Sequence, residues 1–109
     1  MQKVKKNIKK MRADAESIFR AGLAAVAPES AVARCCRIED ERLLIGSRSY
    51  DLAEFKNIYA IGCGKAAATM AKALERRLGE RITAGIVIVK YGHLADLSRI
   101  RIVEAGHPV

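Results

Sequence analysis

Residues 55–90 read FKNIYAIGCGKAAATMAKALERRLGERITAGIVIVK, and this stretch decides the fold. It begins with a run that is nearly continuously apolar up to Ile61, which predicts a strand over residues 55–61. A glycine-rich loop follows, and residues 66–78 are good helix formers that end at Gly79. Residues 84–89 are fully apolar and predict a second strand. The order strand, helix, strand predicts a βαβ unit with a right-handed crossover.

The sequence on either side extends this unit into an α/β domain. Polar and apolar residues alternate over residues 99–103, which predicts a third strand. The predicted fold class is therefore α/β, a Rossmann-like parallel sheet with helices on both faces. Residues 42–52 predict a short hairpin or an edge strand. Apolar positions at three- and four-residue steps predict an amphipathic helix over residues 3–26, which we expect to cover one face of the sheet. Its exposed flank could also drive self-association, so a homo-oligomer is a further expectation.

A shorter helix is expected over residues 28–35, because Pro28 fits the first helical position and Glu29 complements the helix dipole. Cys35 and Cys36 then become core or half-buried thiols. With Cys63 they make three cysteines without the spacing of a zinc site, so no metal site is predicted.

The loop Gly62-Cys63-Gly64-Lys65 is expected to hold an anionic group. Glycines at the carboxyl end of a strand allow a tight turn and close approach of a ligand, and the amides of the next helix carry partial positive charge. Lys65 adds a full charge suited to phosphate or carboxylate. The alternative is structural: the glycines permit the turn, and Lys65 is simply solvated.

Local residues separate three specific interpretations of this loop. A P-loop needs Gly at position 59 and Ser or Thr at position 66, where the chain has Tyr59 and Ala66. The dinucleotide pattern G-x-G-x-x-A fits Gly62 to Ala67, but the second strand ends at Lys90, where an NAD site needs an acid. The third interpretation is an anion site in which Lys65 contacts a phosphoryl group or an acidic substrate.

Other polar residues follow the neighbouring strands. Lys90 and His93 come after the second strand, and His107 follows the third. Because parallel strands end at one edge, where open α/β sheets bind ligands, we expect these residues near the glycine loop. Gly62, Gly64, Lys90, His93 and His107 are therefore the predicted substrate- or phosphate-binding residues, beside the charge of Lys65.

Charge and hydropathy exclude some classes of protein. The formal charge is +8, but six positive residues precede the first acid, Asp14. This basic run indicates a solvated helix face rather than a nucleic-acid site. No apolar run approaches the ~20 residues of a membrane span, and no leader is recognised. A cytoplasmic location is expected. At 109 residues the chain suits one domain but is short for a two-lobed enzyme, and we expect a fragment.

Five segments together resemble one known family. They are IFRAGL (18–23), YAIGCGKAA (59–67), MAKALE (70–75), GIVIVKYGH (85–93) and EAGHP (104–108). In this order they are similar to the amino-terminal domain of the glycerate kinases that form 2-phosphoglycerate. The resemblance covers essentially the whole chain, and the segments together are far more specific than the glycines alone.

The resemblance implies a kinase that transfers the γ-phosphoryl group of ATP, with Mg²⁺, to the 2-hydroxyl of D-glycerate. It also implies a Rossmann-like amino-terminal domain, of which residues 1–109 are the incomplete first part, and a separate carboxyl-terminal domain. Lys65 matches the active-site lysine of that family, so the resemblance implies that Lys65 is the catalytic residue. Cys63 departs from the family, which more often has a smaller residue there. The fragment alone is expected to be inactive.

Two alternatives remain open at this point. Family members have also been called hydroxypyruvate reductases, which implies an NAD(P) site that Lys90 argues against. The other alternative is a non-catalytic module that binds small anions.

Overall fold

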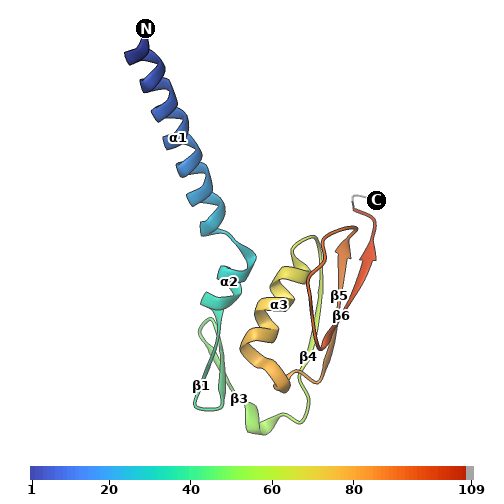
Figure 1. Cartoon of the computed structure of the whole chain (residues 1–109). Helices are drawn as coiled ribbons and strands as arrows, with labels where there is room; N and C mark the ends of the chain where they lie inside the picture. Colours follow the sequence, from blue (N-terminus) through green and yellow to red (C-terminus); the bar gives the residue numbers. More distant parts are fainter. Residues whose placement is uncertain (108–109) are drawn as a thin grey trace.

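The computed structural model describes residues 1–107 and shows three α-helices and six strands in that part of the chain (Figure 1). The helices are α1 (Gln2–Ala25), α2 (Pro28–Cys35) and α3 (Ala67–Leu78). The strands are β1 (Cys36–Glu39), β2 (Arg42–Ile45), β3 (Arg48–Asp51), β4 (Tyr59–Cys63), β5 (Ala84–Lys90) and β6 (Ile100–Ala105).

The parallel sheet has the strand order β4-β5-β6, and α3 connects β4 to β5. The predicted βαβ unit, the third strand and the α/β fold class are therefore confirmed. Alternate residues of the strands turn their side chains toward α3, where Val87, Val89 and Ile100 pack against its buried alanines. Gly79 ends α3 with a φ of +55°, a conformation that favours glycine.

The first strand of this sheet begins later than the sequence predicts. The structure places β4 at Tyr59–Cys63 rather than at residues 55–61. Ile58 instead exchanges hydrogen bonds with Thr83: the Thr83 N–H donates to the Ile58 carbonyl at 2.8 Å, and the Ile58 N–H donates to Thr83 Oγ1 at 3.1 Å. The strand can then extend to Cys63, because its register with β5 continues from Tyr59–Ala84 to Cys63–Ile88.

A second, antiparallel sheet has the order β1-β2-β3. The predicted hairpin over residues 42–52 is confirmed as β2 and β3, whereas β1 was not predicted. Its turn to β2 uses Asp40 and Glu41 at φ values of 49° and 60°, positions where the sequence offers no glycine as a signal. Glu41 also accepts a 2.6 Å hydrogen bond from Arg81, which follows α3, and so links this sheet to the parallel one.

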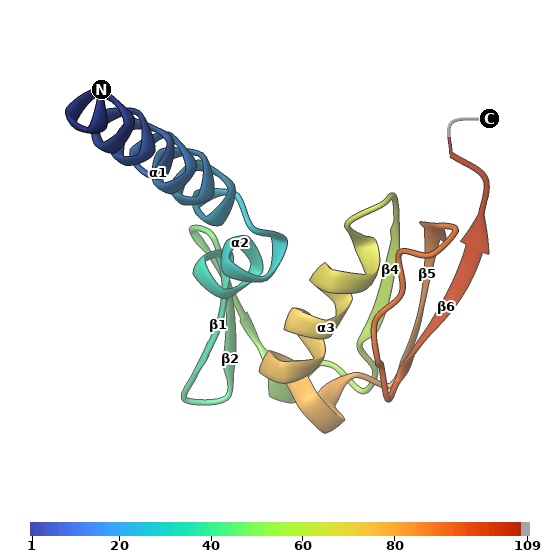
Figure 2. The ribbon, with the colours of Figure 1, turned by 45° about the horizontal axis from the view of Figure 1, so that its top comes forward.

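Only one face of the parallel sheet is covered within residues 1–107. The helix α3 lies between that face on one side and α2 with the small sheet on the other (Figure 2). The prediction that helices cover both faces is therefore not met by this part of the chain, since Ile61 on the other face is 83% exposed.

The long helix α1 contradicts the prediction that it covers the sheet. It begins and ends close to the predicted positions, but it projects away from the sheets (Figures 1 and 2) and has no buried residue. The molecule consequently measures 70 × 37 × 21 Å. None of the helices in residues 1–107 is both long and apolar enough to span a membrane. Cys35 is exposed and Cys36 half-buried, so the prediction of core or half-buried thiols is wrong for Cys35.

Candidate active site

The carboxyl ends of β4, β5 and β6 lie at one edge of the parallel sheet, next to the amino-terminal end of α3 (Figure 1). This edge carries the predicted site residues: the loop Gly62–Lys65 after β4, Lys90 and His93 at the end of β5, and His107 after β6. The structure therefore brings the three strand ends together, as the sequence suggests. Pro108, which follows His107 in the resemblance, lies outside the described residues.

The two glycines of the loop have different physical roles. Gly64 has a φ of +114°, which a residue with a side chain rarely adopts, and its N–H donates to the Ile88 carbonyl of β5 at 2.9 Å. That N–H is already used, so Gly64 serves the site through the conformation of the loop. Gly62 has an ordinary φ, and a Cβ added there would meet Val87 Cγ1 at 3.5 Å, a normal contact distance. The turn itself requires glycine only at position 64.

The first turn of α3 presents unused hydrogen-bond donors. Its N-cap residue, Ala66, has no side chain that can cap the helix. Within residues 1–107, no acceptor is found for the N–H groups of Ala68 and Thr69. Lys65 precedes this turn; its side chain is exposed and has no ion-pair or hydrogen-bond partner in the described part of the chain. An anion placed here would meet the helix dipole and a free ammonium group together.

The loop after β5 is fastened to the end of β6. The Gly92 N–H donates to Glu104 Oε2 at 2.8 Å, and the Tyr91 N–H donates to the Ala105 carbonyl at 3.2 Å. The His93 N–H donates to the Lys90 carbonyl at 3.0 Å, closing a tight turn in which Gly92 has a φ of +80°. Glu104 was not singled out from the sequence, because its partner lies on another strand and no local pattern reveals it.

Within residues 1–107, the side chains predicted for this edge do not bind one another. Lys90 is half-buried, whereas His93 and His107 are exposed. The only polar contact of the His93 ring within residues 1–107 is local, with Nδ1 3.3 Å from the Tyr91 carbonyl oxygen. No hydrogen bond or ion pair in the described residues joins Lys65 to any of the three. These residues share only their position at one edge of the sheet. Because they are not bonded to one another, they are free to contact a ligand.

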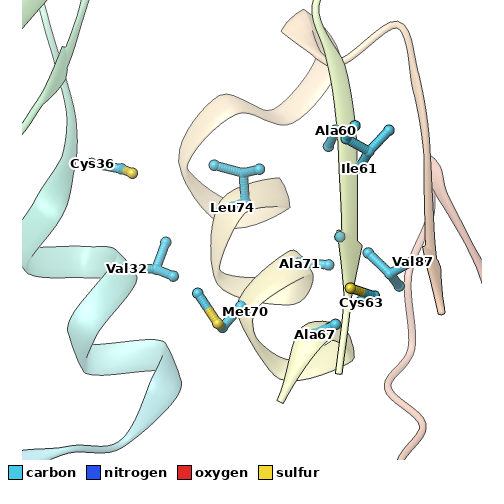
Figure 3. A pocket seen from close by; sticks show the side chains of 11 residues that line it. Val32, Cys36, Ala60, Ile61, Cys63, Ala67, Met70, Ala71, Leu74 and Val87 are labelled. Atoms are coloured by element: carbon cyan, nitrogen blue, oxygen red, sulfur yellow. The ribbon is translucent and has the colours of Figure 1, made fainter. Parts of the chain in front are cut away.

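An apolar cavity of about 290 Å³ lies beside the glycine loop but differs from it in chemistry (Figure 3). Val32 and Cys36 line one side, Met70 and Leu74 of α3 point into it, and β4 closes the other side (Figure 3). Burial raises the pKa of the Cys36 thiol, the neighbouring Cys35 raises it further, and Arg77 opposes the shift. No lysine, arginine or histidine lines this cavity, so it does not suit an anion.

The sequence profile of the family described as a domain of unknown function, DUF4147, matches residues 14–109. This chain belongs to the DUF4147 family. A glycerate 2-kinase from Pyrococcus horikoshii is 33% identical over 82 residues, which are 75% of this chain and 18% of the relative. A D-glycerate 2-kinase from Thermotoga maritima is 45% identical over 53 residues, 48% of this chain and 13% of the relative.

Two solved structures share the fold of this chain. The crystal structure of a protein from Pyrococcus horikoshii matches with a TM-score of 0.75 and 29% identity over 91% of this chain and 22% of that one. A glycerate kinase from Thermotoga maritima matches with a TM-score of 0.65 and 30% identity over 93% of this chain and 21% of that one. The chain thus spans less than a quarter of the relatives it matches, and the resemblance to glycerate kinases is confirmed.

Proposed function

We propose that residues 1–109 form the amino-terminal portion of a two-domain glycerate kinase, which transfers the γ-phosphoryl group of ATP to the 2-hydroxyl of D-glycerate. The free Lys65 beside the uncapped first turn of α3 carries this proposal, because it provides an anion site in a chain whose relatives are named glycerate kinases. The rest of the amino-terminal domain and a carboxyl-terminal domain would complete the site, so this portion alone would be inactive.

In this proposal Lys65 acts on the charge of the reacting groups. Phosphoryl transfer spreads negative charge over the transferred group, and catalysis depends mainly on positioning and electrostatic stabilisation. The ammonium group of Lys65 would contact the phosphoryl group or the glycerate carboxylate, and the N–H groups of Ala68 and Thr69 would strengthen the positive potential at the same point.

The other edge residues would bind and orient the substrate. Lys90 and His93 would contact it from the end of β5, and His107 from the end of β6. Gly64 would set the shape of the loop, and Gly62 would take part through its backbone alone. The hydrogen bond from Gly92 to Glu104 would hold the β5 loop in place during this contact.

Residues 1–107 offer a site for the phosphates of ATP but no ready site for Mg²⁺. ATP phosphates suit the charge at Lys65, and Mg²⁺ would neutralise them during transfer. Residues 1–107, however, contain no group of three or more His, Cys, Asp or Glu side chains that could hold a metal ion. Mg²⁺ is usually held by one or two carboxylates together with phosphate oxygens and waters, so the ATP phosphates would supply part of its ligands.

Substitution of Lys65 tests the proposal in the full-length protein. The assay measures ADP release by a coupled reaction, with ATP and D-glycerate as substrates. In it, Lys65→Met should lower kcat by at least about a hundredfold, because it removes charge stabilisation of the transferred group. Lys56→Met is the matched control, since Lys56 is an exposed residue preceding β4, away from its carboxyl end. Near-normal turnover of Lys65→Met would remove this lysine from the site.

A second candidate function is NAD(P)-dependent reduction of hydroxypyruvate. Two proteins from Agrobacterium vitis that are 49% and 45% identical over 49 residues are named putative hydroxypyruvate reductases. The spacing of Gly62, Gly64 and Ala67 also fits a dinucleotide loop, but β5 ends at Lys90 where ribose hydroxyls need an acid. Quenching of nicotinamide fluorescence by the full-length protein would favour the reductase, and its absence would favour the kinase.

A further inference from the structure

The first half of α1 carries six positive side chains that no acidic residue of the described chain neutralises. We call residues 2–12 the basic segment; its cations are Lys3, Lys5, Lys6, Lys9, Lys10 and Arg12. Within residues 1–107 none of them has an ion-pair partner. The segment lies at the end of α1 that is far from both sheets (Figures 1 and 2). It precedes residues 14–109, which the family profile matches, so its charge belongs to this chain and lies outside that profile.

The basic segment also has an apolar stripe. Val4, Ile8 and Met11 follow one another at steps of four and three residues, which places them on one face of the helix. Their exposed fractions are 62%, 46% and 62%. Lys5 and Arg12 flank this stripe, and the other cations lie further round the helix. The segment therefore combines an exposed apolar face with a cationic polar face.

These two faces together restrict what the segment can bind. Pairing with α1 of a second copy would cover the stripe, but α1 has seven basic and two acidic residues, so two such helices repel each other. A nucleic acid would neutralise the cations but leave the stripe in water, and the segment has no aromatic side chain that could stack on bases. A bilayer with anionic headgroups satisfies both faces, because apolar side chains enter the headgroup boundary while lysine stems carry their charge to the phosphates.

We infer that the basic segment lies on the surface of a membrane that contains anionic phospholipids, with Val4, Ile8 and Met11 facing the acyl chains. Clusters of about four to eight cations on an amphipathic helix bind such surfaces, and each cation adds to the attraction. The binding is reversible, because three apolar side chains anchor a protein far less firmly than a membrane span does. Kinase activity plays no part in it.

Sedimentation of the full-length protein with lipid vesicles tests this binding. At about 0.1 M salt the protein should bind vesicles of phosphatidylcholine with about one third phosphatidylglycerol at least about tenfold more tightly than vesicles of phosphatidylcholine alone. Raising the salt to about 0.5 M should release it, because exposed charges are then screened. Equal binding to the two kinds of vesicle, or no binding to either, would overturn the inference.

Two pairs of substitutions distinguish the basic segment from the rest of the positive charge. Lys9→Gln with Lys10→Gln should weaken binding to the anionic vesicles at least about tenfold, since it removes two cations of the cluster. Arg48→Gln with Lys56→Gln is the matched control, because it removes the same charge from exposed residues outside α1 and should change the affinity less than about twofold. Equal weakening by the two pairs would assign the attraction to the whole surface and contradict a role of the segment.

The apolar stripe distinguishes a membrane from other anionic partners. Ile8→Gln keeps every charge and should weaken vesicle binding at least about threefold, because a polar side chain gains nothing from the acyl region. An unchanged affinity, tighter binding to a short duplex DNA than to the anionic vesicles, or a dimer that Ile8→Gln dissociates would each assign the segment to another partner and refute the membrane site. All the substituted residues are exposed, so every variant should keep the Tm of the parent protein.

Discussion

The helices α1 and α3 are both amphipathic in sequence, yet they behave differently in the fold. The 12 residues of α3 include five buried residues, whereas the 24 residues of α1 include none. The difference lies in what surrounds them: short connections tie α3 to β4 and β5, so the sheet is beside its apolar face. A periodic pattern therefore predicts that a helix forms and which side is apolar, but not which surface that side meets.

The largest expected difference between the two helices comes from a charge placed on each. Ala68 of α3 is 1% exposed and Ala15 of α1 is exposed. Ala68→Arg should reduce the free energy of unfolding by more than about 3 kcal/mol, because it overpacks the core and buries an unpaired charge. Ala15→Arg should change it by less than about 0.5 kcal/mol. Urea denaturation measures both, and a large loss at Ala15 would show that α1 is covered in solution.

A second comparison uses one glutamate from each helix. Glu75 of α3 accepts three backbone N–H bonds from the start of β6, whereas Glu16 of α1 pairs with Arg20 on the exposed helix surface at 2.8 Å. Glu75→Ala should cost about 2 kcal/mol, since it leaves backbone donors near β6 without an acceptor. Glu16→Ala should cost about 0.3–0.5 kcal/mol, as exposed pairs of this spacing do. Equal losses in urea denaturation would mean that Glu75 does not anchor β6.

The Glu75 anchor also predicts a dependence on pH. Burial by itself would raise the pKa of Glu75, but the N–H donors of Ser98, Arg99 and Ile100, together with the charge of Arg99, lower it from its ordinary value of 4.5. A lowered folded pKa means that the stabilisation is fully present above pH 4.5 and is lost as the pH falls through the folded value. The stability difference between the protein and Glu75→Gln should therefore shrink below pH 4.5, and a difference that stays constant would contradict this.

Effects of opposite sign are expected for a glycine in each region. Gly64→Ala should destabilise the protein by about 1–3 kcal/mol, because its φ of +114° strains any residue with a side chain. Gly22→Ala in α1 should stabilise the helix by about 0.5–1 kcal/mol, since a Cβ there meets nothing within 4 Å. Thermal melts of the two variants should shift in opposite directions, and shifts of the same sign would refute the assignment.

Local patterns predicted those parts of the fold that local interactions determine. The helix α3, its end at Gly79 and the strand β5 were found because their signals lie within a few residues. The strand β1 was missed, because four alternating residues directly after a helix carry little signal. The roles of Glu75 and Glu104 depend on backbone groups of other elements, which no sequence spacing reveals.

The candidate site likewise has features that the sequence predicts and features that depend on contacts between distant elements. Its place at the carboxyl edge and the choice of Lys90, His93 and His107 came from strand order, whereas Lys65 came from the glycine loop and the family resemblance. The structure puts all four at one edge. That Gly64 donates its N–H to Ile88, and so is not an anion donor, required coordinates. The catalytic and binding roles of these residues remain predictions.

The most direct test is to identify the product formed by the full-length protein with ATP, Mg²⁺ and D-glycerate by ³¹P NMR. The edge containing Lys65 is proposed to position a phosphoryl group for the 2-hydroxyl, so the spectrum should show 2-phosphoglycerate growing as ATP is consumed. Formation of 3-phosphoglycerate, or no phosphoglycerate from a folded protein that instead oxidises NAD(P)H with hydroxypyruvate, would contradict the proposed function.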